Sequence, residues 1–202
     1  MASIYQIKPA FQNLLRPLTR RLAAAGVTAN QVTSAAALLS LAVGAVIGCF
    51  PTAKAPLLVL PAFLFARMAL NAIDGMLARE HGMKSRLGAI LNEIGDVVSD
   101  SALYLPLALV PGFNPPLVVM AAVLAIITEM TGVVAVQIGA TRRYDGPMGK
   151  SDRAFAFGLV ALLLGIGVPR GSWLNWGVGA IDVLLILTVL NRGRRALNER
   201  VA

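Results

Sequence analysis

The chain has 202 residues, of which 57% are hydrophobic and only 14% charged, and its formal net charge is +8. Its apolar runs recur at about the 20 residues that a helix needs to cross a bilayer, which excludes a soluble globular domain. Because the positive charge is spread over short segments instead of a folded basic module, nucleic acid is not an expected partner.

Residues 1–25 precede the first long apolar run and have the pattern of an amphipathic helix. Apolar residues recur there at intervals of three and four, with basic residues between them. This striped pattern predicts a helix that lies in the membrane interface, and it differs from the single apolar block of a cleavable signal peptide.

Six apolar runs follow, and each is predicted to form a transmembrane helix. Their boundaries are 32–50, 56–78, 87–110, 116–140, 154–169 and 173–191. Residues 32–191 would form a six-helix bundle, and residues 192–202 a basic cytoplasmic tail. The expected fold is therefore all-α and polytopic, with one membrane domain that covers residues 1–202.

Basic residues alternate along this pattern. Fifteen of the 18 Lys and Arg lie before the first span, in alternate loops and after the last span, whereas Lys54 and Arg170 occupy the opposite loops and Arg67 lies inside a span. Because Lys and Arg are retained on the cytoplasmic side, both termini are expected to be cytoplasmic, in a protein of the inner membrane.

The densest polar cluster lies at the end of the second span and the start of the third. Helical periodicity places its members on one face of each helix: Asn71, Asp74 and Ala78 on the second, and Asn92, Asp96 and Asp100 on the third. Carboxylates inside a membrane are costly and usually functional. Oxygen ligands that converge near the cytoplasmic boundary predict a site for a hard divalent cation such as Mg²⁺ or Mn²⁺.

Small residues accompany this cluster. Gly75, Ala78 and Gly88 would let a planar or phosphorylated ligand approach the backbone closely. Alternatively, they would simply let membrane helices pack against each other.

The spacing D-G-x2-A-R-x8-G-x7-D, from Asp74 to Asp96, resembles the signature of the CDP-alcohol phosphotransferase family, D-x2-D-G-x2-A-R-x8-G-x3-D-x3-D. The segment from Gly26 to Thr33, G-V-T-A-N-Q-V-T, is similar to the G-x-T-P-N-x2-T segment that begins the first span of the family, with alanine in place of proline. Gly149-Lys150 also matches a Gly-Lys pair of the family.

The resemblance implies that an acceptor hydroxyl displaces CMP from a CDP-linked donor. CDP-diacylglycerol is the favoured donor, and a soluble CDP-alcohol is the alternative. The resemblance further implies a homodimer and assigns roles by position: Asp74, Asn71 and Asn92 at metal-ligand positions, Asp96 beside the metal as general base, Gly75, Ala78 and Gly88 along the cytidine and ribose pocket, and Arg79 at the nucleotide end.

Two departures from the signature affect the metal. Asn71 and Asn92 stand at its first and third aspartates, and each keeps a carbonyl oxygen but removes a negative charge. Unless Glu93 or Asp100 contributes, two carboxylates remain. We expect one tightly held ion, two weakly held ions, or a protein that binds a CDP-lipid without turnover.

Basic residues cluster on the expected cytoplasmic side before and at the start of the fifth span. Lys150, Arg153 and the Arg142–Arg143 pair could bind phosphates, including that of a phosphorylated acceptor, although membrane topology also explains them. The acceptor is a small alcohol whose identity stays open.

Other polar residues inside the spans have no motif. Arg67 would pair with an acid or reach a ligand, and Glu129 and Asp182 would bond between helices or subunits. Cys49 is expected in the core. Intramembrane charges also occur in transporters, but a transporter would place them across several spans within an inverted repeat, so the sequence favours a phospholipid-synthesising transferase.

Overall fold

The computed structural model describes the backbone of residues 4–199 and the side chains of residues 9–199, and within this range the fold is helical without strands. Its elements in chain order are α1 (Ile4–Ala24), α2 (Ala29–Cys49), α3 (Lys54–Glu80), α4 (Arg86–Tyr104), the 3-10 helix η1 (Leu105–Leu109), α5 (Pro115–Val134), the 3-10 helix η2 (Ala135–Ile138), α6 (Lys150–Gly165) and α7 (Ser172–Asn198).

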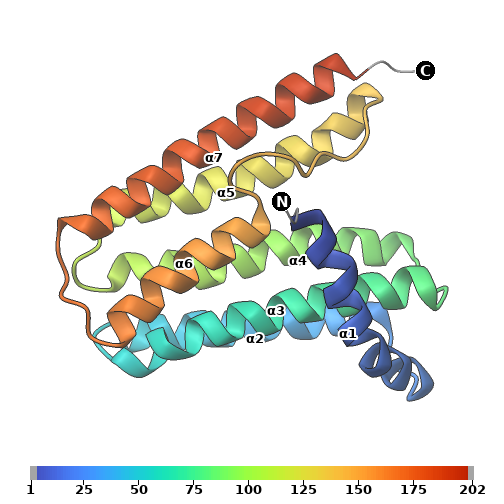
Figure 1. The fold of residues 1–202 in the computed structure, drawn as a ribbon, viewed down its shortest axis with the longest axis horizontal. Helices are drawn as coiled ribbons and strands as arrows, with labels where there is room; N and C mark the ends of the chain where they lie inside the picture. Colours follow the sequence, from blue (N-terminus) through green and yellow to red (C-terminus); the bar gives the residue numbers. More distant parts are fainter. Residues whose placement is uncertain (1–3, 200–202) are drawn as a thin grey trace.

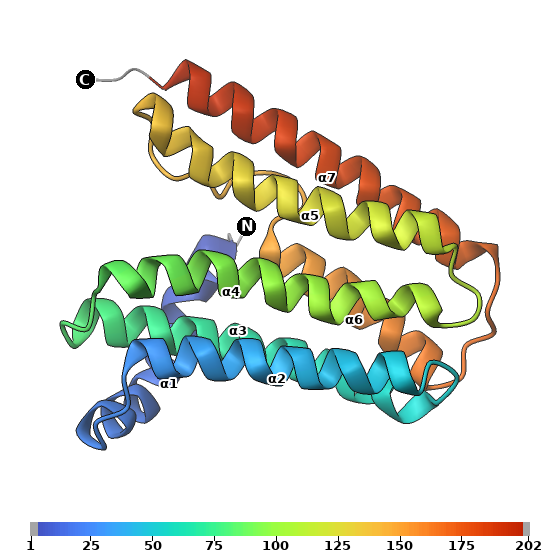
Figure 2. The same cartoon turned by 180° about the vertical axis from the view of Figure 1, so that it is seen from behind.

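The helices α2 to α7 run roughly along one common axis, and α1 crosses them near one end (Figure 1). Seen from behind, α5 and α7 form a pair that diverges from α2, α3 and α4 toward the end where α7 finishes (Figure 2). The backbone of α3 lies close to α2, α6 and α1, and that of α4 lies close to α2, α5 and η1, with few close backbone contacts between α3 and α4 themselves. The α3 and α4 helices therefore face each other through their side chains.

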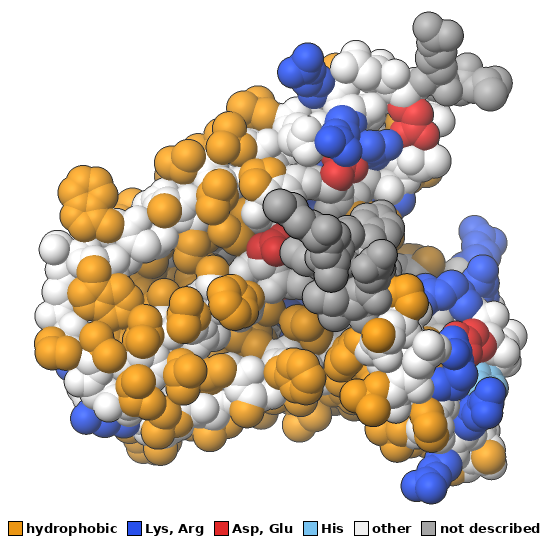
Figure 3. All heavy atoms as spheres, in the orientation of Figure 1, with side chains coloured by type: hydrophobic (Ala, Val, Ile, Leu, Met, Phe, Trp, Pro, Cys, Tyr) orange, Lys and Arg blue, Asp and Glu red, His pale blue; other side chains and the backbone are white. Residues whose placement is uncertain are grey.

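Four helical segments are long and apolar enough to cross a membrane: Ala29–Cys49, Lys54–Glu80, Pro115–Ile138 and Ser172–Asn198. The other two helices of the bundle differ for physical reasons, because α4 carries acidic residues along one face and α6 has only 16 residues. Apolar side chains cover the middle of the surface, and most of the basic ones gather at one end (Figure 3). The protein is thus an integral membrane protein.

Helix α1 lies against α3. The rings of Phe11 and Phe65 meet edge to face with centroids 5.8 Å apart, and Arg16 donates two hydrogen bonds to Glu80. Thr19 is fully buried beneath the helix. The predicted amphipathic helix therefore forms and is tied to the rest of the fold.

Caps and a left-handed glycine explain where two of the helices begin. Gly26, at φ +78°, turns the chain after α1, and Thr28 then caps α2 in a reciprocal pair of hydrogen bonds with Gln31. Ser85 caps α4 by accepting the backbone N–H of Gly88. These caps place the starts of α2 and α4 beside each other.

Three expectations need correction. Helix α6 begins at Lys150 instead of residue 154, since the Asp152 side chain accepts the N–H of Gly149 and starts the helix there. Helix α7 continues through Asn198 instead of ending near residue 191, where the last apolar run ends. Cys49 is exposed at the end of α2, where an apolar thiol can face lipid instead of the core.

Candidate functional site

The polar faces of α3 and α4 meet as the sequence predicts. The Asn71 amide on α3 donates to Asp96 Oδ1 on α4 at 3.3 Å. The Asp74 carboxylate, only 4% exposed, accepts a 2.7 Å hydrogen bond from the Thr33 hydroxyl on α2. Lys150, at the start of α6, contacts Asp96 Oδ1 through its ammonium group. We call these five residues from four helices the polar centre.

Asp96 is the most accessible carboxylate of the polar centre, with 21% of its side chain exposed. Its Oδ1 atom faces Lys150 and Asn71, and the Arg67 guanidinium lies 3.6 Å away. Arg67 also donates to the Asp96 backbone carbonyl at 3.1 Å. These donors all approach Oδ1, so Oδ2 is the oxygen left to act on a ligand.

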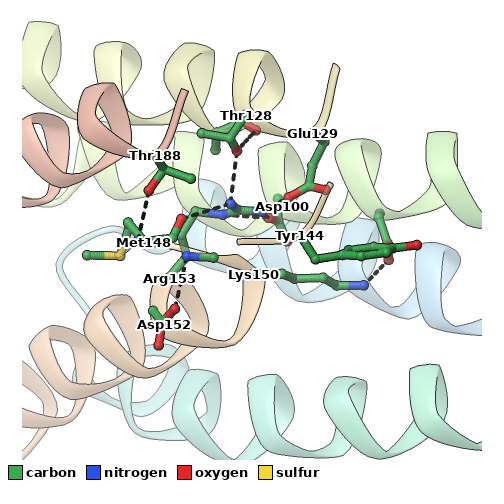
Figure 4. Close-up of polar contacts among 12 residues, drawn as sticks. Asp100, Thr128, Glu129, Tyr144, Met148, Lys150, Asp152, Arg153 and Thr188 are labelled. Carbon is green, nitrogen blue, oxygen red and sulfur yellow. Dashed lines mark hydrogen bonds and ion pairs between the residues drawn. The ribbon is translucent and has the colours of Figure 1, made fainter. Parts of the chain in front are cut away.

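Deeper in the bundle, a second group of charges forms a buried ion-pair network around Arg153 (Figure 4). Its guanidinium is 0% exposed and donates to Asp100 Oδ2 at 2.8 and 3.1 Å, to Glu129 at 3.0 Å and to Thr128 at 3.1 Å. Arg67 donates to the other Asp100 oxygen at 2.5 Å. Both Asp100 oxygens are therefore occupied by guanidinium groups.

The network extends into the loop of residues 139–149. Arg142 bonds both Glu93 oxygens at 3.1 and 2.8 Å and reaches Glu129 at 3.0 Å. Partial burial lowers the pKa of Arg142, but the hydrogen bonds that Arg142 donates to Glu93 and Glu129 outweigh this effect and raise its pKa above the usual value. The Arg142 guanidinium is thus a fixed positive charge between α4 and α5.

Ion pairs and hydrogen bonds of Arg143 and Arg192 also connect the end of α7 to the loop of residues 139–149. Arg192, almost fully buried, donates to the backbone carbonyls of Thr128 and Asp145. Arg143 pairs with Asp145 at 3.0 Å and with Glu199 at 2.7 Å. The buried and half-buried arginines of this region therefore pair with carboxylates or donate hydrogen bonds to backbone carbonyls.

The structure brings Asn71, Asp74, Asp96 and Lys150 together, whereas Arg153, also a predicted site residue, is fully buried away from solvent. Arg153 faces the buried network. Asn92 and Ala78 are half-buried on their helices. These positions keep their predicted roles as proposals.

The predicted nucleotide-binding residues show specific packing. Arg79 folds back over Gly75, where a Cβ atom would lie 3.0 Å from its Nη2 atom. A Cβ at Gly88 would lie 2.6 Å from Asn30 Oδ1 and 2.9 Å from Ser85 Oγ. Gly88 therefore leaves room for the polar start of α2, a packing role that does not exclude contact with a ligand.

Sequence reasoning assigned no site role to Thr33 and Asn30. The segment from Gly26 to Thr33 resembles the start of the first span in the family. In the structure its Thr33 hydroxyl donates to Asp74, and its Asn30 amide contacts Ser85 at the start of α4. Their spacing of three residues, which puts both on one helix face, was the available signal. The seven-residue spacing between Arg67 and Asp74 indicates that both lie near one face of α3. Of the two roles predicted for Arg67, the structure shows the pairing with acidic residues.

The donor set of the polar centre suits a hard divalent cation in part. Among residues 9–199, no three His, Cys, Asp or Glu side chains gather as a metal site. Asp74 and Asp96 with the amide oxygen of Asn71 or Asn92 supply the oxygen chemistry that Mg²⁺ and Mn²⁺ prefer. These residues fit one such ion, with the remaining positions left to water and substrate oxygens.

An open apolar groove of about 270 Å³ lies between α3 and α6. Its lining includes Phe65, Met68, Ser151, Phe155 and Leu162. Met68 lies one helical turn before Asn71 on α3 and Ser151 follows Lys150 on α6, so this part of the groove lies near the polar centre. A single site thus combines carboxylates, an ammonium group and an apolar channel.

Comparison with known proteins agrees with this arrangement. Inner membrane protein YnbA of Escherichia coli is 49% identical over 96% of this chain and 96% of its own. A phosphatidylinositol phosphate synthase of Corynebacterium glutamicum is 30% identical, over 95% of this chain and 87% of its own.

Solved structures share the fold. Phosphatidylinositol phosphate synthase (PgsA1) of Mycobacterium tuberculosis, in complex with manganese and citrate, aligns with a TM-score of 0.76 and 22% identity over 92% of each chain. The same enzyme with CDP-DAG bound aligns with a TM-score of 0.72 and 24% identity, over 92% of this chain and 97% of that chain. Residues 26–189 match the family model for CDP-alcohol phosphatidyltransferase. This chain therefore belongs to the CDP-alcohol phosphatidyltransferase family, whose members transfer substituted phosphate groups.

Proposed function

We propose that this protein transfers a phosphatidyl group from CDP-diacylglycerol to the hydroxyl group of a small alcohol and releases CMP. The observation that carries the proposal is the position of the polar centre at the end of the apolar groove. A lipid donor needs both environments at once, because its acyl chains are apolar and its pyrophosphate is strongly charged.

The groove supports a diacylglycerol donor over a soluble CDP-alcohol. Phe65 and Phe155, which line it, are exposed at the surface that would face lipid. Acyl chains along α3 and α6 would place the pyrophosphate near Lys150, whose ammonium group can pair with phosphate oxygens. The relative with CDP-DAG bound supports the same donor.

The chemistry would use the residues of the polar centre in distinct ways. Asp74, Asp96 and the amide oxygens of Asn71 and Asn92 would hold a divalent cation, which when bound offsets the charge that builds on the departing CMP. Asp96 Oδ2 would accept the proton of the acceptor hydroxyl while Lys150 and Asn71 fix Oδ1. The acceptor oxygen forms a bond to the phosphorus of the phosphatidyl group, and the bond from that phosphorus to the CMP oxygen breaks.

The nucleotide would occupy the cytoplasmic end of α3 and α4. Gly75, Ala78 and Gly88 would border the cytidine and ribose, and Arg79 would hold the nucleotide end, as the family signature implies. Arg79 is exposed, so it can turn away from Gly75 to reach a ligand.

The acceptor would enter beside the loop of residues 139–149. A phosphate on this alcohol would have to compete with Glu93 and Glu129 for Arg142, because both carboxylates already bond its guanidinium. We propose a small alcohol in general, and a set of phosphorylated and unphosphorylated alcohols separates the two classes.

The oligomeric state and the membrane topology of the enzyme are also proposals. We propose a homodimer in the inner membrane, built from one membrane domain over residues 1–202, with α4 and α6 completing six spans and with both termini cytoplasmic. Labelling of Lys84→Cys and Arg170→Cys, each made together with Cys49→Ser because Cys49 is itself exposed, tests the orientation in intact cells, since only Arg170→Cys should react with an impermeant reagent. Cross-linking in native membranes tests the dimer.

The decisive experiment is CMP release from purified protein in nanodiscs that contain CDP-diacylglycerol, with Mn²⁺ or Mg²⁺ and a pool of alcohols. Release that needs both metal and acceptor, and that Asp96→Asn abolishes, is the expected result. Glu80→Gln is the matched control, because it removes an exposed carboxylate at the end of α3 that pairs only with Arg16 among the described residues. CDP-diacylglycerol binding without CMP release would instead identify a binding protein.

A further inference from the structure

We propose that the polar centre holds a single divalent cation and that Lys150 provides the positive charge that a second ion would otherwise supply. This inference rests on the proposed function for what the site does. The number of bound ions can be measured independently of that function. It starts from two amides, Asn71 and Asn92, at positions where the family signature has carboxylates. Each replacement removes one negative charge that would attract a cation.

Asn71 shows how the site has adapted. Its amide nitrogen lies 3.3 Å from Asp96 Oδ1 and donates a hydrogen bond to it. A carboxylate oxygen in that place would repel Asp96 and would need a cation between the two groups. The amide makes the contact favourable without a metal ion.

Asp100 does not restore the missing charge. Its two oxygens bond Arg67 and Arg153, whose side chains are only 3% and 0% exposed. Drawing Asp100 toward a metal would leave these two buried guanidinium groups without their partner, which is strongly unfavourable.

Glu93 is engaged as well. Both of its oxygens accept hydrogen bonds from Arg142, which also bonds Glu129. The Glu93 side chain therefore belongs to the charge balance of the loop of residues 139–149. Two carboxylates, Asp74 and Asp96, remain for a cation.

Lys150 then fills part of the electrostatic role of a second ion. Its ammonium group contacts Asp96 Oδ1 directly, and its charge also acts on Asp74. With one ammonium group against two carboxylates, a single divalent ion leaves a small positive excess that a pyrophosphate can neutralise. A second ion would leave a large excess of positive charge in a partly buried site, which is unfavourable.

The test is the number and affinity of bound Mn²⁺ ions, measured by calorimetry in nanodiscs without any donor. The expected result is one ion for the natural chain and two for the double variant Asn71→Asp, Asn92→Asp. If the double variant does not fold, Asn71→Asp alone should still tighten Mn²⁺ binding. Two ions in the natural chain would overturn the proposal.

A second arm isolates Lys150. Lys150→Met should tighten Mn²⁺ binding by at least about tenfold, since it removes a positive charge beside the ion. Lys84→Met, which removes an exposed lysine between α3 and α4, should leave the affinity unchanged. Equal affinities in Lys150→Met and the natural chain would refute the role of Lys150.

The two proposals fail in different ways. A protein that binds one Mn²⁺ ion with the expected Lys150 effect but never releases CMP would refute the proposed function alone. A protein that releases CMP and binds two ions would refute the single-ion site alone.

Discussion

The polar centre and the Arg153 network are two clusters of charge in one helical bundle, and they differ in how completely their charges are used. In the network, Arg153 is 0% exposed and both Asp100 oxygens bond guanidinium groups. In the polar centre, Asp96 is partly accessible and Oδ2 lies away from the donors that hold Oδ1. Saturated charges stabilise a fold, whereas carboxylate oxygens that remain available can act on a ligand.

The largest effect is expected from a substitution that disrupts the Arg153 network. Arg153→Met would leave Asp100 and Glu129 buried without their main shared partner, and we expect a loss of about 3–5 kcal/mol in the free energy of unfolding. Thermal unfolding in detergent measures it. Arg153→Lys keeps the charge but not the forked geometry, so its stability should lie between those of the natural chain and Arg153→Met.

The next effect separates activity from stability at the polar centre. Asp96→Asn should reduce CMP release by about 10²–10⁴-fold because it removes the carboxylate that we propose as the proton acceptor. Its melting temperature should stay close to that of the natural chain. A large drop in melting temperature would assign Asp96 to the structural class of the network.

A smaller effect concerns the support of Asp74. Thr33→Val removes the hydroxyl that donates to Asp74 while keeping the shape of the side chain, and a hydrogen bond of this kind contributes about 0.5–1.5 kcal/mol. We expect weaker Mn²⁺ binding by several-fold, measured by calorimetry. Thr33→Ser should restore the natural affinity, and its failure to do so would mean that the methyl group matters more than the hydroxyl.

The smallest effect is at the exposed end of α7. The hydrogen bond from the Thr141 hydroxyl, with help from Arg143, lowers the pKa of Glu199 below its usual range. Because its pKa is lower in the folded chain, docking of the 139–149 loop should be favoured above the ordinary pKa of about 4.3 and should weaken as the pH falls. Protease cleavage of this loop should therefore rise in acid for the natural chain, and Glu199→Gln should reduce that pH dependence, with the part that remains coming from the carboxylates that pair with Arg142 and Arg143.

Helices and the core of the polar centre could be predicted from the sequence because they follow from periodicity. Apolar runs locate the starts of the helices to within about four residues but several of their ends less closely, and the spacing from Asn71 to Asp74 and from Asn92 to Asp96 fixes which side chains share a face. The contact between Asn71 and Asp96 confirms that the two faces meet.

Which acidic residue each basic residue pairs with could not be predicted from periodicity. Arg153 and Lys150 are three residues apart at the start of α6 and looked like one basic cluster, yet one is buried against Asp100 and Glu129 and the other contacts Asp96. The outcome depends on how α6 is rotated against α4 and α5, which local spacing does not encode. For the same reason, the sequence leaves two roles open for Arg67, pairing with an acidic residue or contact with a ligand.

The groove between α3 and α6 opens at the exposed side chains of Phe65 and Phe155, which we expect to face lipid. A donor that uses it would arrive by lateral diffusion within the leaflet and would never need to enter water. The turnover rate would then follow the mole fraction of donor in the membrane rather than its bulk concentration. Diluting the donor with inert lipid at constant total donor should therefore slow the reaction, while diluting the nanodiscs in buffer should not change the rate per protein.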